Sequence, residues 1–401
     1  MPHRLLVNSL LALATALASD ALLAQVGRRT IPSWRNERLE RAARISHPVY
    51  NHGLAPLASF VHAYGDVRAP YFTNSLGFRD SALRQVELAS PRRRILVIGD
   101  SFTEGVGVPY EATFVGRIAE TATLDNIDML NAAVVSYAPS IYYRKIRYYI
   151  EHVGLQVSGV VVFIDLSDIE DELYLYEMDG RENVISRSPD NPAWLSRFKF
   201  FLYDNSVLSR LYWLTKESLT EKRRRESQGR IGSVTGVGRA CWTIDTDLFE
   251  RVGKPGLDKS RQYMDRLAVF LSARGIPLTV AVYPWPDQVL ARDINSKHVR
   301  FWRAWAELNH ACFVDLFPVF IDARDPAAVI TEDFIPFDVH FSRAGHARLA
   351  KAFLDATRVH SLPGTPPDPQ GDTPSQRPVL AASALTGVSN SNHPGCAVLS
   401  R

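Results

Sequence analysis

Ser101, Asp338 and His340 are the residue types that covalent acyl chemistry needs, and they occur in the chain order Ser, Asp, His. A serine hydroxyl is a weak nucleophile until a neighbouring base takes its proton. A histidine acts as that base when a carboxylate fixes its tautomer and orientation. We therefore predict a catalytic triad with Ser101 as nucleophile, His340 as base and Asp338 as the orienting carboxylate.

The segment before Ser101 indicates how the serine would be presented. Residues 95–98 form a short apolar run rich in β-branched side chains, which is typical of a fully buried parallel strand. Gly99 ends this run, so Ser101 would lie at the carboxyl end of the strand, where open α/β sheets bind ligands. Gly105 and Gly107 keep the following turn free of side chains, which lets a substrate approach the backbone amide of Ser101.

These blocks resemble the SGNH, or GDSL-like, hydrolase family. The triplet Gly99-Asp100-Ser101 is similar to the family's first block, and Asp338 and His340 are similar to its last block, just before the final helix. The single residue between the acid and the histidine resembles exported bacterial members, including acetyltransferase-like relatives that act on exported polysaccharides. The resemblance spans residues 94–357 and implies an enzyme that cleaves or transfers acyl esters.

The resemblance also implies an oxyanion hole. The family's second and third blocks offer a glycine amide and an asparagine side chain, and the matching positions here are Ser136 and Ser167. The implied donors are the backbone amides of Ser101 and Ser136 and the hydroxyl of Ser167. Losing one such donor can cost on the order of a hundredfold in rate. Since Ser136 and Ser167 stand in place of the family's usual residues, a degenerate SGNH domain without catalysis is an alternative.

Five apolar runs that alternate with helical patterns define the expected fold. The expected strands are residues 95–98, 127–130, 160–164, 278–283 and 312–316. Strands that alternate with helices favour an α/β fold: a doubly wound, flavodoxin-like three-layer sandwich with a mainly parallel five-stranded sheet. Residues 170–255 break the rhythm after the third strand and are expected to be an insertion near the site. Its aromatic segment suits a lid or a carbohydrate platform, while its helical spacing favours a helical pair with a small core of its own.

The ends of the chain have different compositions from the expected domain at residues 91–360. A basic head, an apolar stretch and small residues at 16–18 predict that residues 1–24 are an export signal, or an anchor formed by residues 5–24. The protein is therefore expected to be periplasmic or secreted, with a possible membrane tether. Residues 25–90 are expected to pack on the main domain, and the Pro-, Ser- and Gly-rich residues 361–401 to form a disordered tail.

Composition excludes few classes of partner. The formal charge of +3 and the lack of a basic face with interleaved aromatics argue against nucleic acid. Three cysteines fit neither a disulfide scaffold nor a zinc site, and no cofactor or metal is expected. A metal site built from Asp338, His340 and His346 would lack the one-turn helical spacing of paired histidine ligands and a further ligand.

The function expected from these observations is a serine-dependent esterase. Its substrate would be an acyl ester, most plausibly an O-acetyl group on cell-envelope carbohydrate. A sugar hydroxyl in place of water as second acceptor would make it an O-acetyltransferase on exported polysaccharide. A third hypothesis is a binding protein whose first loop, with Ser101 and Thr103, cradles phosphate, but it gives Asp338 and His340 no role.

Overall fold

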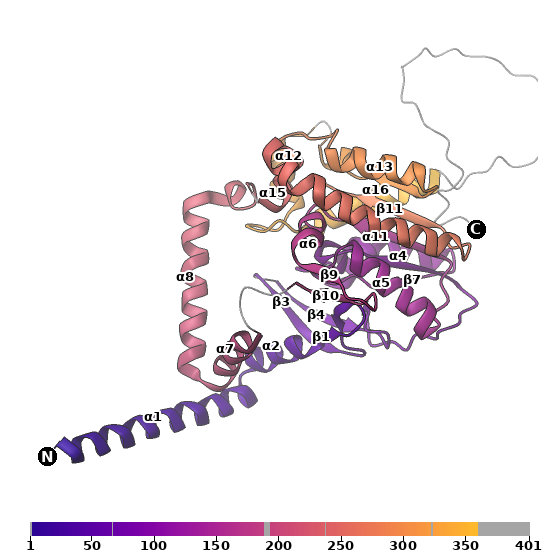
Figure 1. Cartoon of the computed structure of the whole chain (residues 1–401). Helices are drawn as coiled ribbons and strands as arrows, with labels where there is room; N and C mark the ends of the chain where they lie inside the picture. The colour runs from indigo at the N-terminus through magenta and orange to yellow at the C-terminus, as the bar shows by residue number, and fades with distance from the viewer. Residues whose placement is uncertain (1, 66, 188–192, 237, 322–323, 360–401) are drawn as a thin grey trace, which may run out of the picture.

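An eight-stranded sheet forms the centre of the protein in this computed structural model, which describes residues 2–65, 67–187, 193–236, 238–321 and 324–359 (Figure 1). The strand order is β12-β11-β8-β6-β7-β5-β4-β3. The strands are β3 (Ser59–Tyr64), β4 (Val67–Thr73), β5 (Arg79–Asp80), β6 (Arg93–Ile98), β7 (Ile127–Asn131), β8 (Gly159–Ile164), β11 (Leu278–Val282) and β12 (Cys312–Asp315). The expected tail at residues 361–401 lies outside the described residues.

The five expected strands are present and parallel, in the order β7-β6-β8-β11-β12. In chain order this is 2-1-3-4-5, the flavodoxin-like arrangement, so the predicted fold class is confirmed. Every residue of β8 is buried, as its continuous apolar sequence predicts for a strand covered on both faces. The predicted strand number was too low, because β3, β4 and β5 add three antiparallel strands beyond β7.

Helices cover both faces of the sheet. The chain steps from β6 to β7 in one direction and from β7 to β8 in the other, so right-handed crossovers place α4 and α5 on opposite faces. Helix α4 packs against α16, and α5 packs against α11. The helices of this part are α3 (Ser101–Glu104), α4 (Phe114–Leu124), α5 (Pro139–Arg147), α11 (Lys254–Ser272), α12 (Pro286–Leu290), α13 (Lys297–Leu308), α14 (Pro318–Ile321), α15 (Pro326–Asp333) and α16 (Arg343–Val359).

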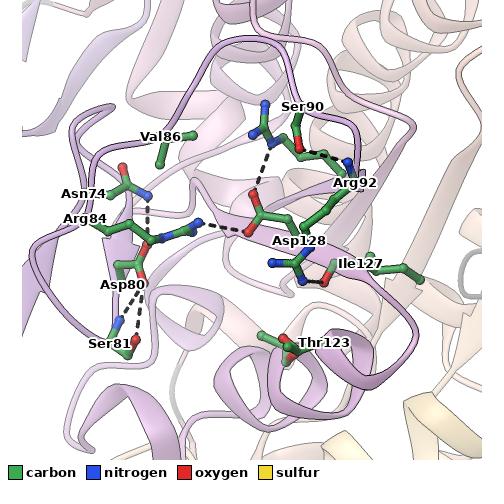
Figure 2. Close-up of polar contacts among 12 residues, drawn as sticks. Asn74, Asp80, Ser81, Arg84, Val86, Ser90, Arg92, Thr123, Ile127 and Asp128 are labelled. Atoms are coloured by element: carbon green, nitrogen blue, oxygen red, sulfur yellow. Dashed lines mark hydrogen bonds and ion pairs between the residues drawn. The ribbon is translucent and has the colours of Figure 1, made fainter.

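The N-terminal part of the chain joins the sheet through β5. Arg79 of β5 pairs with Asn131 of β7. Figure 2 shows a second link, in which Arg84 contacts Asp80 in β5 and Asp128 in β7, both at 3.0 Å. Upstream lie α1 (Pro2–Thr30), α2 (Pro32–Ala43) and a two-stranded ribbon of β1 (Arg44–His47) and β2 (Asn51–Leu54). Strand β3 is the outermost strand on this side of the sheet.

The expected insertion contains short elements and one pair of longer helices. Its elements are α6 (Asp168–Tyr174), β9 (Tyr176–Met178), β10 (Val184–Ser186), α7 (Ala193–Asn205), α8 (Val207–Gly232), α9 (Gly238–Cys241) and α10 (Thr246–Leu248). Helices α7 and α8 pack against each other and against α1. The buried Arg210 of α8 donates to Glu37 of α2 at 2.7 Å. The α7–α8 pair therefore packs against the N-terminal helices, and many of its large apolar side chains remain exposed.

Helix α1 is almost entirely exposed. Residues His3–Thr30 are long and apolar enough to cross a membrane, judged by length and composition. In Figure 1 this helix extends away from the body beside α7 and the lower end of α8. An apolar helix at this position is compatible with either the export signal or the anchor expected above.

Candidate active site

Ser101 lies where the sequence placed it, at the carboxyl end of β6. It is the first residue of the short helix α3, whose N-cap, Asp100, accepts the backbone N–H of Phe102 at 2.9 Å. Gly99 allows this sharp passage from strand to helix, because a Cβ there would collide with the Thr103 hydroxyl and lie 2.9 Å from the Phe163 carbonyl oxygen. The Ser101 hydroxyl therefore lies just beyond the carboxyl end of the central strand β6.

The three residues of the predicted triad lie in contact. The Ser101 Oγ is 2.8 Å from Nε2 of His340, although 239 positions separate them in the chain. The Nδ1 of the same ring is 2.5 Å from Oδ1 of Asp338. These distances connect the serine hydroxyl, the imidazole and the carboxylate in the order that general-base activation requires.

The loop over residues 334–341 shows how one residue between acid and histidine can suffice. A bridge between Phe334 and Phe341 closes the loop, and Ile335 donates to the carbonyl of His340 at 2.9 Å. Within it, Oδ1 of Asp338 accepts the backbone N–H of His340 at 2.9 Å as well as contacting its ring. The carboxylate therefore fixes both the backbone and the imidazole of the same residue.

Tyr64 is a site residue that the sequence analysis missed. It ends β3 at the edge of the sheet, and its hydroxyl donates to Oδ2 of Asp338 at 2.8 Å. The Tyr64 hydroxyl oxygen also lies 3.0 Å from Nδ1 of His340, and the Tyr64 and His340 rings meet edge to face. The N-terminal extension thus contributes directly to the site. No local pattern around Tyr64 distinguishes it from the other aromatic residues of that segment.

Charges in the site favour a protonated imidazole paired with an ionised carboxylate. Burial lowers the pKa of His340, but the hydrogen bond and charge of Asp338 outweigh it and hold that pKa above its usual value. Burial raises the pKa of Asp338, and its contacts with His340 and Tyr64 lower it to about 2. Asp338 is therefore an anion across the range in which the histidine titrates.

A cluster of three buried carboxyl groups lies behind Ser101: Asp100, Asp165 and Asp168, with one oxygen of each within 4.8 Å of the others. Burial, then the charge of Asp165, raises the pKa of Asp100 to about 8. Burial, then the charges of Asp100 and Asp165, raises the pKa of Asp168 well above its usual range. Protonation of these carboxyl groups therefore offsets the negative charge of the cluster. Hydrogen bonds from the protein, such as that from the Tyr142 hydroxyl to Asp168 at 2.6 Å, stabilise it further.

Ser136 and Ser167, the other two predicted oxyanion residues, line one small cavity with Ser101 and His340. Its volume is about 180 Å³. Within the described chain, the backbone amides of Ser101 and Ser136 have no internal hydrogen-bond acceptor, so both remain available to a ligand. The Ser167 hydroxyl is already used, because it donates to Oδ1 of Asp165 at 2.6 Å.

The backbone at Ser136 explains why a glycine suits this position. Its φ of 61° lies in the left-handed region, which glycine adopts at little cost and other residues at about 1–2 kcal/mol. Two contacts hold it there: Glu104 accepts the N–H of Val135 at 2.7 Å, and Tyr176 donates to the carbonyl of Ser136 at 2.6 Å. Arg44 and Tyr71 contact the same buried Glu104 and keep its pKa at about 2, although burial alone would raise it.

Arg239 is a second residue that the sequence analysis did not place in the site. It comes from α9 in the insertion, lines the small cavity and forms an ion pair with Asp171. Burial raises the pKa of Asp171 to about 6 despite this partner. The guanidinium supplies a fixed positive charge beside the two free amides.

A second cavity, of about 800 Å³, adjoins the first, because Tyr64 lines both, and Asp338 of the triad lines the larger one. It lies between the body and the α7–α8 pair, and its lining is rich in aromatic and basic side chains. These are Arg41, Lys199, Phe200, Tyr203, Trp213, Lys216, Arg224, Arg225 and Phe337. The insertion thus forms one wall of a space that leads to the triad.

His346 occupies a structural position. It is buried, and its Nδ1 accepts the backbone N–H of Phe114, the first residue of α4, at 3.1 Å. Burial lowers the pKa of His346 to about 3, so the ring is neutral. Its hydrogen bond ties the last helix to α4.

No family model and no curated protein matches this chain. Solved structures with a similar fold include an esterase from a Pseudoalteromonas species, with 11% identity, a TM-score of 0.37 and coverage of 67% of this chain and 97% of that one. An acetylxylan esterase from Geobacillus stearothermophilus has 14% identity, a TM-score of 0.37 and coverages of 68% and 96%. A lipolytic protein of the G-D-S-L family from Desulfitobacterium hafniense has 14% identity, a TM-score of 0.36 and coverages of 66% and 98%.

Proposed function

We propose that the protein is a serine esterase of the SGNH type that acts on small acyl esters. The observation that carries this proposal is the connected series from Ser101 through His340 to Asp338, with contacts of 2.8 and 2.5 Å. The two free amides in the adjoining cavity support it, because acyl transfer needs donors for a developing oxyanion.

In the proposed mechanism, Ser101 Oγ attacks the ester carbonyl while Nε2 of His340 takes its proton. The amides of Ser101 and Ser136 then donate to the oxyanion of the tetrahedral intermediate. His340 returns the proton to the leaving alcohol, and an acyl-enzyme forms on Ser101. Water, activated by the same imidazole, releases the acid and restores the serine.

The small cavity supports a short acyl group. Its 180 Å³ corresponds to about six water molecules at roughly 30 Å³ each. An acetyl group has three heavy atoms, two of which are the attacked carbonyl, and fits in this space. A long acyl chain does not fit within this cavity, whose lining includes Val106 and Ser167, and would have to extend beyond it.

The larger cavity is the proposed place for the alcohol part of the substrate. Its lining combines the rings of Tyr203, Trp213 and Phe337 with the basic groups that contact them, so a sugar there would meet apolar surface and hydrogen-bond donors. The apolar N-terminal helix supports export to the cell envelope, where such carbohydrate occurs. Acetylated envelope carbohydrate is therefore the proposed substrate class.

A second candidate is an O-acetyltransferase that passes the acetyl group to an exported polysaccharide. The observation that favours it is the shared wall of the two cavities, because an acceptor sugar in the larger one would lie beside the acyl-enzyme. The chemistry up to the acyl-enzyme is identical in both candidates. Only the second acceptor, water or a sugar hydroxyl, differs.

The test is a series of 4-nitrophenyl esters from acetate to decanoate, with the parent chain and the Ser101→Ala and His340→Ala variants. We expect turnover of acetate that declines steeply with chain length and is lost in both variants. Adding acetyl-accepting oligosaccharides then separates the candidates, since a transferase produces acetylated sugar and an esterase produces acetate. Turnover that survives in Ser101→Ala, or a preference for decanoate, would contradict the proposal.

A further inference from the structure

The turn between α7 and α8 carries an unusual concentration of exposed apolar side chains. We define the α7–α8 tip as residues 198–212. Its exposed large side chains, between 37 and 70% accessible, are Phe198, Phe200, Phe201, Leu202, Leu208, Leu211 and Tyr212. Soluble proteins rarely expose such a contiguous group in water, so the group indicates a surface that is covered in the functional state.

The tip lies directly beside α1. Arg28 of α1 donates to the side chain of Asn205 at 2.7 Å, and Oδ1 of Asp20 accepts the backbone N–H of Leu208 at 3.0 Å. Figure 1 shows α1 passing α7 and the lower end of α8 before it extends away from the body. The exposed apolar surface of the tip is therefore continuous with that of α1.

The length of α1 fixes how deep the tip would lie. Its apolar stretch, residues 5–26, has 22 residues and is roughly 33 Å long, close to the ~30 Å of a bilayer's hydrocarbon core. Asp20 precedes the end of this stretch by six residues, or about 9 Å. Leu208, which is bonded to Asp20, would then lie at about this depth. Amphipathic helices at membrane surfaces bury their apolar faces by about 5–10 Å.

We propose that the α7–α8 tip inserts into the same bilayer leaflet as the end of α1, so that the protein is held to the membrane at two adjoining points. The proposal is independent of the reaction catalysed. It explains Asp20, whose carboxylate would be costly inside an apolar stretch but here meets the N-terminal amides of α8.

Basic residues around the tip favour a bilayer over a second copy of this chain. Arg28 and Arg29 lie in the last turn of α1, Lys199 lies within the tip, and Lys216 follows it in α8. Both lysines contact the Trp213 ring, at 4.1 and 5.0 Å, an arrangement of aromatic and cationic groups typical of the lipid headgroup region. The larger cavity, which Phe200 and Tyr203 help to line, would then lie close to the membrane surface.

The experiment uses the full chain in vesicles of phosphatidylethanolamine and phosphatidylglycerol. A single Leu208→Cys or Phe201→Cys substitution carries an environment-sensitive nitrobenzoxadiazole label, and the labelled parent chain supplies the background from native cysteines. The matched control is Leu308→Cys, because Leu308 is 80% exposed and ends α13, a helix drawn far from α1 and α7 in Figure 1. Lipids that carry a nitroxide quencher near the headgroup report contact with the bilayer.

We expect blue-shifted emission and at least twofold stronger quenching at Leu208→Cys and Phe201→Cys than at Leu308→Cys. Equal quenching at all three positions would overturn the proposal. Blue-shifted emission without lipid quenching would also overturn it, because the tip would then be covered by protein, such as a second copy. The intact mass of the vesicle-bound chain shows whether residues 1–18 are retained. If they have been cleaved off and the labels on the tip stay unquenched, the proposed insertion of the tip into the bilayer is refuted.

Discussion

Tyr64→Phe is the substitution that tests the site most finely, because it removes one hydroxyl and keeps the ring. That hydroxyl donates to Oδ2 of Asp338 at 2.8 Å. A hydrogen bond to a charged group contributes about 1.5–3 kcal/mol. The Asp338 side chain is 28% exposed, so water replaces part of the contact and the lower end applies. About 1.5 kcal/mol of lost positioning corresponds to roughly a tenfold decrease in kcat/KM.

The pH profile distinguishes positioning from a general loss of structure. Without the Tyr64 hydroxyl, more of the negative charge of Asp338 acts on His340, so the pKa of His340 rises further above its usual value. The acidic limb of the kcat/KM profile for 4-nitrophenyl acetate should therefore move to higher pH. Tyr174→Phe, at an exposed tyrosine, is the control and should leave both rate and profile unchanged. A Tyr64→Phe enzyme with less than a twofold change and an unshifted profile would refute the role assigned to Tyr64.

Three further predictions follow from the charges and backbone of the site. Asp338→Asn should reduce kcat by about ten-thousandfold and, since Asp338 raises the pKa of His340, shift the residual acidic limb to lower pH; an unshifted limb would contradict this. Asp100→Asn should flatten the stability profile measured by urea unfolding between pH 4 and 8. Its folded pKa of about 8 exceeds the unfolded value of 3.8, so the folded chain binds the extra proton and the parent loses stability as pH rises through this window. Ser136→Gly should keep the rate and leave stability unchanged or raised by up to about 1 kcal/mol, since only the amide is used; a tenfold slower enzyme would show that the hydroxyl matters.

The sequence predicted the fold class because its strongest signals are local. Continuous apolar runs such as that of β8 are typical of strands buried on both faces, and five such runs between helices favour few topologies. The strands β3, β4 and β5 were not counted. They alternate weakly, contain Pro70 and are antiparallel, so they give no comparable signal.

The approach of Ser101 to His340 could be anticipated from the residue types and from the ordered pair of blocks that resemble SGNH hydrolases, because a serine nucleophile needs a histidine base. Tyr64 and Arg239 could not, because each reaches the site through long-range packing of the extension or the insertion. The hydroxyl of Ser167 illustrates a different limit. Its residue type suggested a donor to the oxyanion, whereas its direction is set by Asp165, two residues away.

The most direct test of the central claim is the site at which a fluorophosphonate attaches. Intact mass and peptide mapping of the parent chain should show one adduct on Ser101, whose hydroxyl lies 2.8 Å from Nε2 of His340. The adduct should be absent from Ser101→Ala and form much more slowly on His340→Ala. An unlabelled but folded parent chain, or an adduct on any other residue, would contradict the account.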